Sequence, residues 1–317
     1  MRSFAPRTAM IFAAGRGERM RPLSDSLPTP ALPLPDGPVI SSPLELVART
    51  GIRRVVVNAW HLADRLQEAL DRIEQSGLDL RVSREARLMG TAGGLAAARD
   101  AGLLEGDGPV LVLNGDGVLD VTLDPALERH HRDGDLVTLA LLPHPGPERW
   151  SRVLIADGRV QRILPPGRPE PGETPFVYPG AMVVAREALE QLPSVPGEVP
   201  ELLWTPARRA QRLGAAVTTG RWREVGTPAD YLDAVLDRLG GGTVVDPTAR
   251  VHASAQLERT YVGRHAQVGP GAALRDSIVA EGAAVGAQAR VARSVLLGPV
   301  RIAPREQVQG ELRALPR

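Results

Sequence analysis

The fold of this chain is decided by one N-terminal stretch, Ala9-Met10-Ile11-Phe12-Ala13-Ala14-Gly15-Arg16-Gly17-Glu18-Arg19-Met20-Arg21-Pro22. An apolar run that passes directly into glycine is typical of a buried parallel strand that ends in a loop. Glycine permits positive φ and close approach of a ligand, and nearby arginines can neutralise an anion held by backbone N–H groups. The stretch therefore predicts an anion-binding loop. An ordinary strand and turn with solvated arginines is the alternative, because a lone Gly-x-Gly is a weak motif.

The composition limits the classes of protein that fit. The chain has 317 residues, of which 43% are hydrophobic and 24% charged, so it is long enough for two globular domains. Its formal net charge of +1 gives no reason to expect nucleic acid or a membrane surface as a partner. Cysteine is absent, which excludes disulfides, zinc–thiolate sites and a cysteine nucleophile. Lysine is absent too, so all 38 basic side chains are arginine.

Two further absences concern location. No apolar segment of the sequence is long enough to cross a membrane. The N-terminal residues lack the apolar core of a signal peptide. We therefore expect a cytoplasmic protein.

Apolar runs and helical patterns alternate through the first three-quarters of the chain. Strands are expected in the opening stretch and at residues 55–57, 78–83, 109–113 and 136–142. Helices are expected at residues 42–51, 61–75, 91–101 and 227–239, with a further helix from residue 124. This alternation predicts a doubly wound, Rossmann-like α/β domain, which we assign to residues 1–240. Ligands bind at the carboxyl ends of strands in such sheets, so Gly15, Gly17 and Asp116 are expected to share one site.

Several local features refine this expectation. Ser42 is expected to cap the first helix. The dipeptide Asp157-Gly158 predicts a β-hairpin, and residues 176–185 are expected to form one strand. The pair His130-His131 is expected on the surface of a helix, where no other ligand is spaced to complete a metal site.

The pattern changes after Gly240-Gly241-Gly242, which we interpret as a linker. Aliphatic residues then recur about every six positions, at Val245, Val251, Leu257, Val262, Val268, Leu274, Val279, Val285 and Val291. A period of six predicts a left-handed parallel β-helix over residues 241–317, in which each aliphatic side chain points inward and each coil stacks on the last. A disordered Gly/Ala-rich tail is the alternative. Because such a coil exposes its faces and its end, we expect homo-oligomers to form through it.

Four motifs resemble, in the same order, the motifs of one enzyme family. They are Phe12–Leu23, Leu88–Gly94, Asn114–Asp116 and Arg221–Pro228. The first resembles the signature loop of the sugar-1-phosphate nucleotidyltransferases, and the second resembles their second nucleotide loop. The third and fourth resemble their two metal-binding segments. The C-terminal repeats resemble those of the mannose-1-phosphate guanylyltransferase and glucose-1-phosphate adenylyltransferase branches, so the resemblance covers nearly the whole chain.

The resemblance implies an activity and a nucleotide site. A sugar-1-phosphate, or a related phosphorylated cyclitol, would attack the α-phosphorus of an NTP and release pyrophosphate, with Mg²⁺ as cofactor. Backbone N–H groups of Ala14, Gly15 and Gly17 would contact the nucleotide. Arg19 would hold the β- and γ-phosphates. The base and ribose would be lined by Glu85, Gly90 and Thr91.

The resemblance also implies metal and substrate residues. Asp116 would bind Mg²⁺ together with Glu224, and the catalytic residues would be Arg19 and Asp116. Asn58 and Gly180 are assigned to substrate binding. For Asn58, which follows a strand, capping of the next turn is an equal alternative.

The chain departs from the family pattern at three places. Thr29 stands where the family has a catalytic lysine that stabilises charge on the transferred phosphoryl group, and loss of such a group typically costs about 10²–10³ in rate. Glu224 stands where the family has aspartate, which moves the carboxylate by one methylene. Residues 162–166 lack the Glu-Lys pair that holds the sugar phosphate in the family.

Two hypotheses follow from these departures. The first is an active nucleotidyltransferase that uses arginine where its relatives use lysine. The second is a catalytically degenerate homologue that binds a nucleotide or NDP-sugar and acts as a regulatory or scaffolding subunit. The nucleobase and the sugar stay open, and the four tryptophans are too scattered in the sequence to predict a stacking platform.

Overall fold

A computed structural model describes residues 5–73, 77–146 and 149–315. Contacts divide the chain into two compact units, each of which is described by itself. The first unit comprises Met1–Gly15, Ser42–His61 and Glu74–Trp222, and the second comprises Arg16–Ser41, Leu62–Ile73 and Arg223–Arg317. The domain boundary that the change of sequence pattern predicts near residue 240 stays a prediction.

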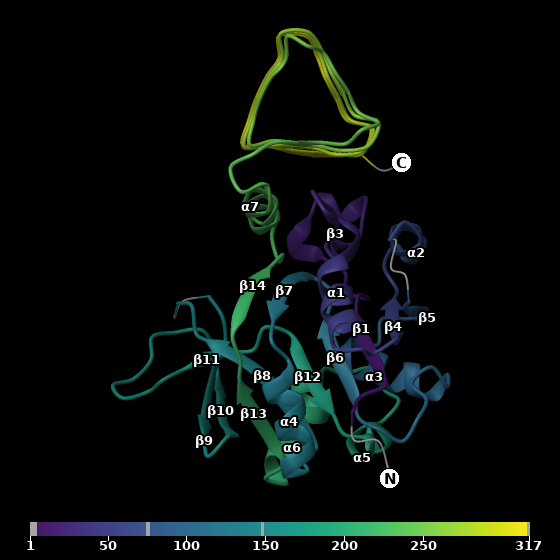
Figure 1. Ribbon diagram of the computed structural model, residues 1–317, viewed down its shortest axis with the longest axis vertical. Coiled ribbons are helices and arrows are strands. Elements are labelled where there is room, and N and C mark those ends of the chain that lie inside the picture. Colours follow the sequence, from purple (N-terminus) through teal and green to yellow (C-terminus); the bar gives the residue numbers. More distant parts are fainter. Residues whose placement is uncertain (1–4, 74–76, 147–148, 316–317) are drawn as a thin grey trace. The chain divides into compact units, whose positions relative to one another are not determined.

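The first unit is built around one mixed sheet. In spatial order, its strands in the described part of the chain are β11 (Phe176–Val177), β9 (Arg152–Ala156), β10 (Arg159–Leu164), β13 (Leu213–Val217), β8 (Val137–Pro143), β12 (Ala181–Val184), β6 (Val110–Asn114), β1 (Thr8–Phe12), β4 (Arg54–Ala59) and β5 (Asp79–Arg84). Strands β6, β1, β4 and β5 run parallel as neighbours, and β12 is antiparallel to β6 and β8 (Figure 1). The central parallel strands are almost wholly apolar because both of their faces are buried.

Helices and short elements complete the first unit. They are α1 (Ser41–Arg49), α3 (Gly90–Asp100), α4 (Asp124–Asp133), α5 (Arg186–Gln191), η4 (Pro200–Trp204), α6 (Thr205–Arg209), β7 (Gly117–Val121) and β14 (Gly220–Glu224), the last ending in residues of the second unit. Leu95 of α3 packs with Met10 and Val56 in the core of this unit. The predicted α/β architecture is confirmed.

The second unit begins with the proline-rich segment. It forms short elements, namely η1 (Glu18–Met20), η2 (Leu23–Asp25), η3 (Thr29–Ala31), β2 (Pro33–Leu34) and β3 (Gly37–Pro38). Two helices follow, α2 (Ala63–Asp71) and α7 (Pro228–Leu239). Thr227 caps α7 because its hydroxyl accepts a hydrogen bond from Asp230 N at 3.2 Å. The Tyr231 hydroxyl of α7 donates to Pro33 O at 2.6 Å, which fixes the helix to the β2–β3 hairpin.

The rest of the second unit is a coil with three flat faces, seen as a triangle in Figure 1. One face is formed by β15 (Val244–Val245), β18 (Tyr261–Val262), β21 (Ile278–Val279), β24 (Val295–Leu297) and β27 (Leu312–Ala314). The second is formed by β16 (Arg250–Val251), β19 (Gln267–Val268), β22 (Ala284–Val285) and β25 (Arg301–Ile302). The third is formed by β17 (Gln256–Glu258), β20 (Ala273–Arg275), β23 (Arg290–Ala292) and β26 (Gln307–Gln309).

The register of these strands explains the sequence period. Val245 pairs with Val262, and Val262 with Val279, so equivalent positions lie 17 residues apart. Each coil therefore has 17 residues and contributes one strand to each of the three faces. Two of the intervals between inward aliphatic residues are six residues long, and the third is five. The repeating aliphatic residues from Val262 onward are buried in one continuous core. These parallel sheets support the predicted β-helix.

Three local predictions are corrected by the structure. Helix α1 begins one residue before Ser42, whose hydroxyl accepts from Leu119 N at 2.8 Å and donates to Leu119 O at 3.1 Å, so it does not cap the helix. The strand expected at residues 176–185 is two strands, interrupted where Gly180 adopts a φ of 94°. The helix expected at residues 61–75 is α2, which runs from Ala63 to Asp71, and the last two expected positions lie outside the described residues. The hairpin at Asp157-Gly158 is confirmed, and both residues have positive φ.

The third correction concerns His130, which is buried rather than exposed on the surface of α4. Its side chain is 7% exposed, and its Nδ1 lies 2.9 Å from Thr138 Oγ1. The Thr138 hydroxyl donates to Asp135 Oδ2 at 3.2 Å, so it accepts from the imidazole, which assigns the proton to Nδ1. Burial, together with the charges of Arg212 and His131, lowers the pKa of His130 to about 4.

The buried imidazole makes the stability of the first unit depend on pH. Because the pKa of His130 is lower in the folded chain than in the unfolded one, the unfolded chain binds more protons between about pH 6.5 and pH 4. We expect the free energy of unfolding to fall by about 2 kcal/mol from this group between pH 7 and pH 5. The control is His130→Gln, which cannot titrate, and urea unfolding of both proteins measures the effect. An equal pH dependence in both would contradict this assignment.

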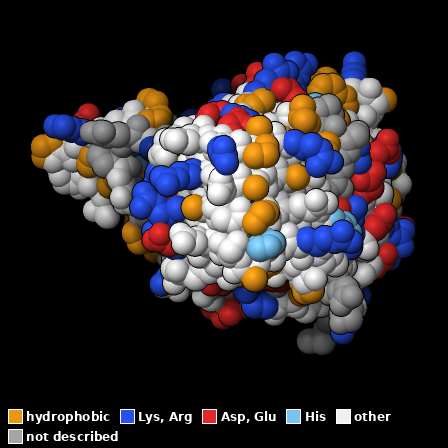
Figure 2. All heavy atoms as spheres, turned by 90° about the horizontal axis from the view of Figure 1, so that it is seen from above, with side chains coloured by type: hydrophobic (Ala, Val, Ile, Leu, Met, Phe, Trp, Pro, Cys, Tyr) orange, Lys and Arg blue, Asp and Glu red, His pale blue; other side chains and the backbone are white. Residues whose placement is uncertain are grey.

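The face of the molecule drawn in Figure 2 is not dominated by one sign of charge. Figure 2 shows arginine, carboxylate and apolar side chains intermixed on the face it presents, in keeping with the net charge of +1. Among the described residues, no helix is both long enough and apolar enough to cross a membrane.

Candidate functional site

In the first unit, the ends of β1 and β6 bring the start of the signature loop next to the predicted metal-binding segment Asn114–Asp116. The strands are parallel neighbours, with Phe12 opposite Asn114. Beyond them, Gly115 N donates to Phe12 O at 2.9 Å, and a Cβ on Gly115 would lie 2.7 Å from the same oxygen. Glycine is therefore required here, and the turn that it makes places partly exposed Asp116 beside the loop that leaves β1.

Gly180 packs against the same turn. Its carbonyl oxygen accepts from Asn114 N at 2.8 Å. A Cβ on Gly180 would lie 2.8 Å from the Asn114 Cβ, and its φ of 94° favours glycine in any case. The structure thus brings Gly180 to the end of β6, next to the segment that carries Asp116.

Asn58, at the end of β4, connects the first loop to the Glu85 segment. Its Oδ1 accepts from Ala13 N at 2.7 Å, and its Nδ2 donates to Glu85 Oε1 at 2.7 Å. The other carboxylate oxygen of Glu85 accepts from Met89 N at 3.0 Å. Burial raises the pKa of Glu85, and these two hydrogen bonds oppose that rise. Asn58 therefore fixes both loops, and its predicted role in substrate binding stays a prediction.

The segment at residues 195–199 covers the start of α3. Gly90 has a φ of 72°, and a Cβ there would lie 2.6 Å from Gly197 O. Thr91 donates from both N and Oγ1 to Glu198 Oε2, at 3.1 Å and 2.6 Å. Its hydroxyl also accepts from Val199 N at 2.9 Å. The predicted nucleotide residue Thr91 thus has its hydroxyl committed to a carboxylate 107 positions away, which nothing in the sequence pattern indicates.

The rest of the signature loop lies on both sides of the boundary between the units. Ala14 is buried in the first unit, and a Cβ on Gly15 would meet no atom within 4 Å. In the second unit, Gly17 has a φ of 63°, and its carbonyl oxygen accepts from the Ser24 hydroxyl at 2.7 Å. A Cβ on Gly17 would lie 3.3 Å from the Thr29 hydroxyl oxygen, so Thr29 is close to the loop. Thr29 itself is 7% exposed at the start of η3.

Two predicted site residues pair directly in the second unit. Arg19 Nη2 lies 3.1 Å from Glu224 Oε1, although the two residues are 205 positions apart in the chain. The Arg19 side chain is 67% exposed and that of Glu224 20%. A Cβ on Gly226 would lie 2.9 Å from Glu224 Oε1 and 3.3 Å from Arg19 Nη1, so glycine leaves room for the pair. The ion pair thus joins Arg19, which is predicted to bind phosphate, to Glu224, which is predicted to bind the metal.

The carboxylates suit one kind of metal site. Within residues 5–73, 77–146 and 149–315, no group of three or more His, Cys, Asp or Glu side chains is arranged to hold a metal ion by protein ligands alone. Mg²⁺ is usually held by one or two carboxylates, with water and substrate phosphates as its other ligands. Each carboxylate by itself, Asp116 in the first unit and Glu224 in the second, offers the hard oxygen donors of that type of binding.

The first unit contains an aromatic cluster that the sequence pattern does not predict. The Trp150 and Trp222 rings lie 5.3 Å apart between centroids, and the Arg149 guanidinium carbon lies 4.8 Å from the Trp150 centroid. Both tryptophans are partly exposed. They are 72 positions apart in the sequence, so only the tertiary fold creates this surface.

Comparisons with known proteins agree on one family. Residues 8–239 match the family described as nucleotidyl transferase. Mannose-1-phosphate guanylyltransferases are among the similar proteins: that of Mycobacterium tuberculosis is 29% identical over 87% of this chain and 80% of its own length. Mannose-1-phosphate guanylyltransferase 1 of Arabidopsis thaliana is 27% identical over 93% and 82% of the two chains, and the beta-B protein of Xenopus laevis is 25% identical over 77% and 72%.

Solved structures support the fold. HddC from Yersinia pseudotuberculosis, in a crystal structure complexed with GMP-PN, superposes with a TM-score of 0.61 at 19% identity, covering 73% of this chain and 99% of its own. The comparisons give no support to the alternative of a degenerate regulatory subunit. Because the family match covers well over half of the chain, the protein belongs to the nucleotidyl transferase family and is, as predicted, a sugar-phosphate nucleotidyltransferase.

Proposed function

We propose that this enzyme transfers a nucleoside monophosphate from an NTP to a sugar-1-phosphate, or to a related phosphorylated cyclitol, forming an NDP-sugar. A phosphate oxygen of the acceptor attacks the α-phosphorus, the bond to the β-phosphate breaks, and pyrophosphate leaves with the electron pair. The observation that carries the proposal is the Gly115 turn, which sets Asp116 beside the loop leaving β1. The names of the relatives favour GTP and mannose-1-phosphate as the first pair to test.

The chain's own residues bind and orient the triphosphate in this proposal. Backbone N–H groups of Ala14, Gly15 and Gly17 face the phosphates, and Arg19 neutralises the leaving pyrophosphate. The base and ribose are held by Glu85, Gly90 and Thr91. Asn58 and Gly180 shape the acceptor side. Because the chain has no lysine, arginine must supply the positive charge that Thr29 does not.

Mg²⁺ is proposed as the metal, with Asp116 and Glu224 as its protein ligands. When bound, a divalent ion neutralises charge on the phosphate oxygens. Glu224 is paired with Arg19 at 3.1 Å, so each of these groups has an oppositely charged partner. This pairing supports roles for both residues in phosphate and metal binding.

Four further assignments belong to the same proposal. The β-helix winds left-handed, and it joins copies of the chain into a homo-oligomer. The domains are residues 1–240 and 241–317, and the enzyme works in the cytoplasm. Light scattering after size-exclusion chromatography tests the oligomer, since a monomeric mass at micromolar protein would contradict it.

The decisive experiment measures pyrophosphate release with each NTP and a panel of sugar-1-phosphates in the presence of Mg²⁺. We expect one NTP and one acceptor to turn over well above the others, and the Asp116→Asn variant to serve as the inactive control. If no pair turns over while calorimetry shows that an NTP binds, the transferase proposal fails and a binding protein remains.

The aromatic cluster leads to a prediction about the acceptor. Sugar rings present C–H faces that pack on aromatic rings, and Trp150 and Trp222 offer partly exposed rings in the region that lacks the family's Glu-Lys pair. We expect Trp150→Ala to raise KM for the sugar phosphate about tenfold while KM for the NTP stays within about twofold. Steady-state kinetics with each substrate varied in turn measures the split. An equal change in both KM values would indicate a structural role instead.

A further inference from the structure

A segment of the first unit between α5 and η4, residues 192–199, contacts helix α3 at both of its ends. At the C-terminal end of α3, Arg99 Nη1 donates to Leu189 O and to Leu192 O, each at 2.6 Å. Arg99 Nη2 lies 2.9 Å from Ser194 Oγ. The following residues reach the N-terminal end of the same helix. We call this segment the strap, because it connects one end of α3 to the other.

The strap accepts hydrogen bonds from amides in the first turn of α3. Gly197 O accepts from Ala92 N at 3.0 Å and from Gly93 N at 3.2 Å. Thr91 N donates to Glu198 Oε2 at 3.1 Å. Amides at a helix N-terminus commonly bind an anion. Because the strap occupies these three amides, they serve to hold the helix and its preceding loop in place rather than to bind phosphate.

The strap is fixed from the core as well as from its polar contacts. Val199, its last residue, is 4% exposed and packs in the core of the first unit. A Cβ on Gly93 would lie 2.6 Å from Val195 O and 3.3 Å from Pro196 Cα, so the strap and α3 approach closely at a glycine. The exposed side chain of Glu198 therefore extends from a backbone that is held in one position.

Carboxylates hold the loop before α3 at two places. Near the start of the loop, Glu85 Oε2 accepts from Met89 N at 3.0 Å. At its end, Glu198 Oε2 accepts from both N and Oγ1 of Thr91. A Cβ on Gly90 would lie 2.7 Å from Glu198 Oε1, so Glu198 lies against this residue too. The loop predicted to line the base and ribose thus depends on a carboxylate from a distant part of the chain.

We propose that Glu198 is a positioning residue for the NTP, an inference that rests on the proposed function. Its carboxylate fixes the backbone and the hydroxyl of Thr91, and with them the conformation of the loop at Gly90. A loop that is held in one conformation loses less entropy when a ligand binds. Glu198 therefore increases the affinity for the NTP, and it has no part in acceptor binding or in the transfer step.

Isothermal titration calorimetry of the full chain with GTP, ATP, CTP, UTP and dTTP, each with Mg²⁺, measures the effect on binding. For the NTP that binds the wild type most tightly, we expect Glu198→Ala to weaken binding about tenfold, since two hydrogen bonds to a charged acceptor are lost. Glu198→Gln is expected to restore the affinity to within about threefold, because its amide oxygen can accept both hydrogen bonds from Thr91. The matched control is Glu201→Ala, which removes an exposed carboxylate of η4 and should bind like the wild type.

Steady-state kinetics separates positioning from a general structural role. In Glu198→Ala, KM for the NTP is expected to rise about tenfold, while kcat and KM for the sugar phosphate stay within about twofold of the wild type. A variant that merely loosened the fold would change all three values.

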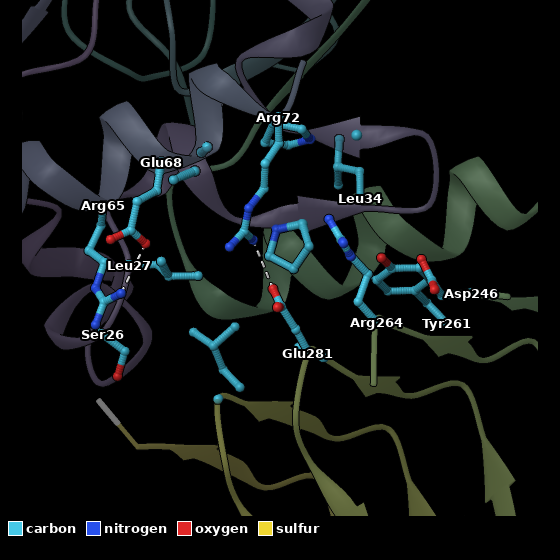
Figure 3. A pocket seen from close by; sticks show the side chains of 18 of the residues that line it. Ser26, Leu27, Leu34, Arg65, Glu68, Arg72, Asp246, Tyr261, Arg264 and Glu281 are labelled. Atoms are coloured by element: carbon cyan, nitrogen blue, oxygen red, sulfur yellow. Dashed lines mark hydrogen bonds and ion pairs between the residues drawn. The ribbon is translucent and has the colours of Figure 1, made fainter. Parts of the chain in front are cut away.

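Hydrogen exchange gives a readout that needs neither nucleotide nor turnover. The Thr91 amide is expected to exchange about tenfold faster in Glu198→Ala than in the wild type, because it loses its acceptor. The control is Arg72→Gln, which removes a different arginine–glutamate contact, that of Arg72 Nη1 with Glu281 Oε2 at 3.0 Å. This contact lies in the wall of a cavity of about 290 Å³ whose lining residues all belong to the second unit (Figure 3). Thr91 exchange should keep its wild-type rate in this control.

The outcomes distinguish this inference from the proposed function. If an NTP binds the wild type and Glu198→Ala binds it equally tightly, the positioning role is overturned and the proposed function stands. The role is also overturned if Glu198→Gln binds as weakly as Glu198→Ala, or if the Thr91 amide exchanges at the wild-type rate in Glu198→Ala. If an NTP binds but no substrate pair turns over, the transferase proposal fails and the binding data still decide the role of Glu198. If no NTP binds the wild type, both fail.

Discussion

Arg19→Gln is expected to lower kcat/KM for nucleotidyl transfer by about 10²–10³, the loss typical of one group that stabilises charge in the transition state. The effect should be large because the chain has no lysine, and Thr29 is predicted to stand at the position of the family's catalytic lysine. The substitution also leaves Glu224 without the guanidinium at 3.1 Å. We therefore expect NTP binding to weaken together with turnover. Pyrophosphate release and NTP titration measure the two effects.

The matched control for Arg19→Gln is Arg16→Gln in the same loop. Arg16 Nη1 lies 3.5 Å from Glu18 Oε1, and both side chains are more than half exposed, so this ion pair contributes little. Turnover of the control is expected to stay within about threefold of the wild type. If Arg19→Gln and Arg16→Gln lose activity equally, turnover depends on the total positive charge of the loop. The specific role proposed for Arg19 is then wrong.

Asp116→Asn is expected to lower turnover on the order of a thousandfold, because the side chain keeps its shape and loses the negative charge that a divalent metal requires. Added Mg²⁺ should not restore the rate at concentrations that saturate the wild type. A readout that does not depend on activity is the binding of Mn²⁺ in the presence of NTP, followed by electron paramagnetic resonance. We expect the number of bound ions to fall in the variant.

Asp120→Asn is the control for this experiment. Asp120 lies four residues further on β7, is exposed, and pairs with Arg49 Nη2 at 3.0 Å. A surface ion pair of this kind contributes about 1 kcal/mol at most, so metal binding and turnover should be nearly unchanged. Normal Mn²⁺ binding by Asp116→Asn would remove Asp116 from the metal site.

The sequence was sufficient where the structural cause is local or periodic. Strand β1 and its loop could be predicted because an apolar run that ends in glycine has few other uses in a globular protein. The β-helix could be predicted because its inward aliphatic residues repeat, and the shortened interval in each coil now follows from the register of Val245, Val262 and Val279.

The rest could not be predicted, because its cause lies in residues far apart in the chain. The contact of Thr91 with Glu198, that of Arg19 with Glu224, and the packing of Trp150 on Trp222 each need the folded chain. The same holds for His130. The helical pattern alone predicts that it is exposed, whereas in the folded chain it is buried beside Thr138.

The 17-residue register of the coil limits how the length of this protein can evolve. An insertion or deletion of one whole coil leaves every inward aliphatic position facing inward, and it changes the height of the stack by one strand spacing, about 4.8 Å. An insertion or deletion of a single residue within a strand instead shifts the register, so that later aliphatic side chains no longer point inward. Homologous coils are therefore expected to differ in length by multiples of 17 residues, with smaller insertions confined to the corners between faces.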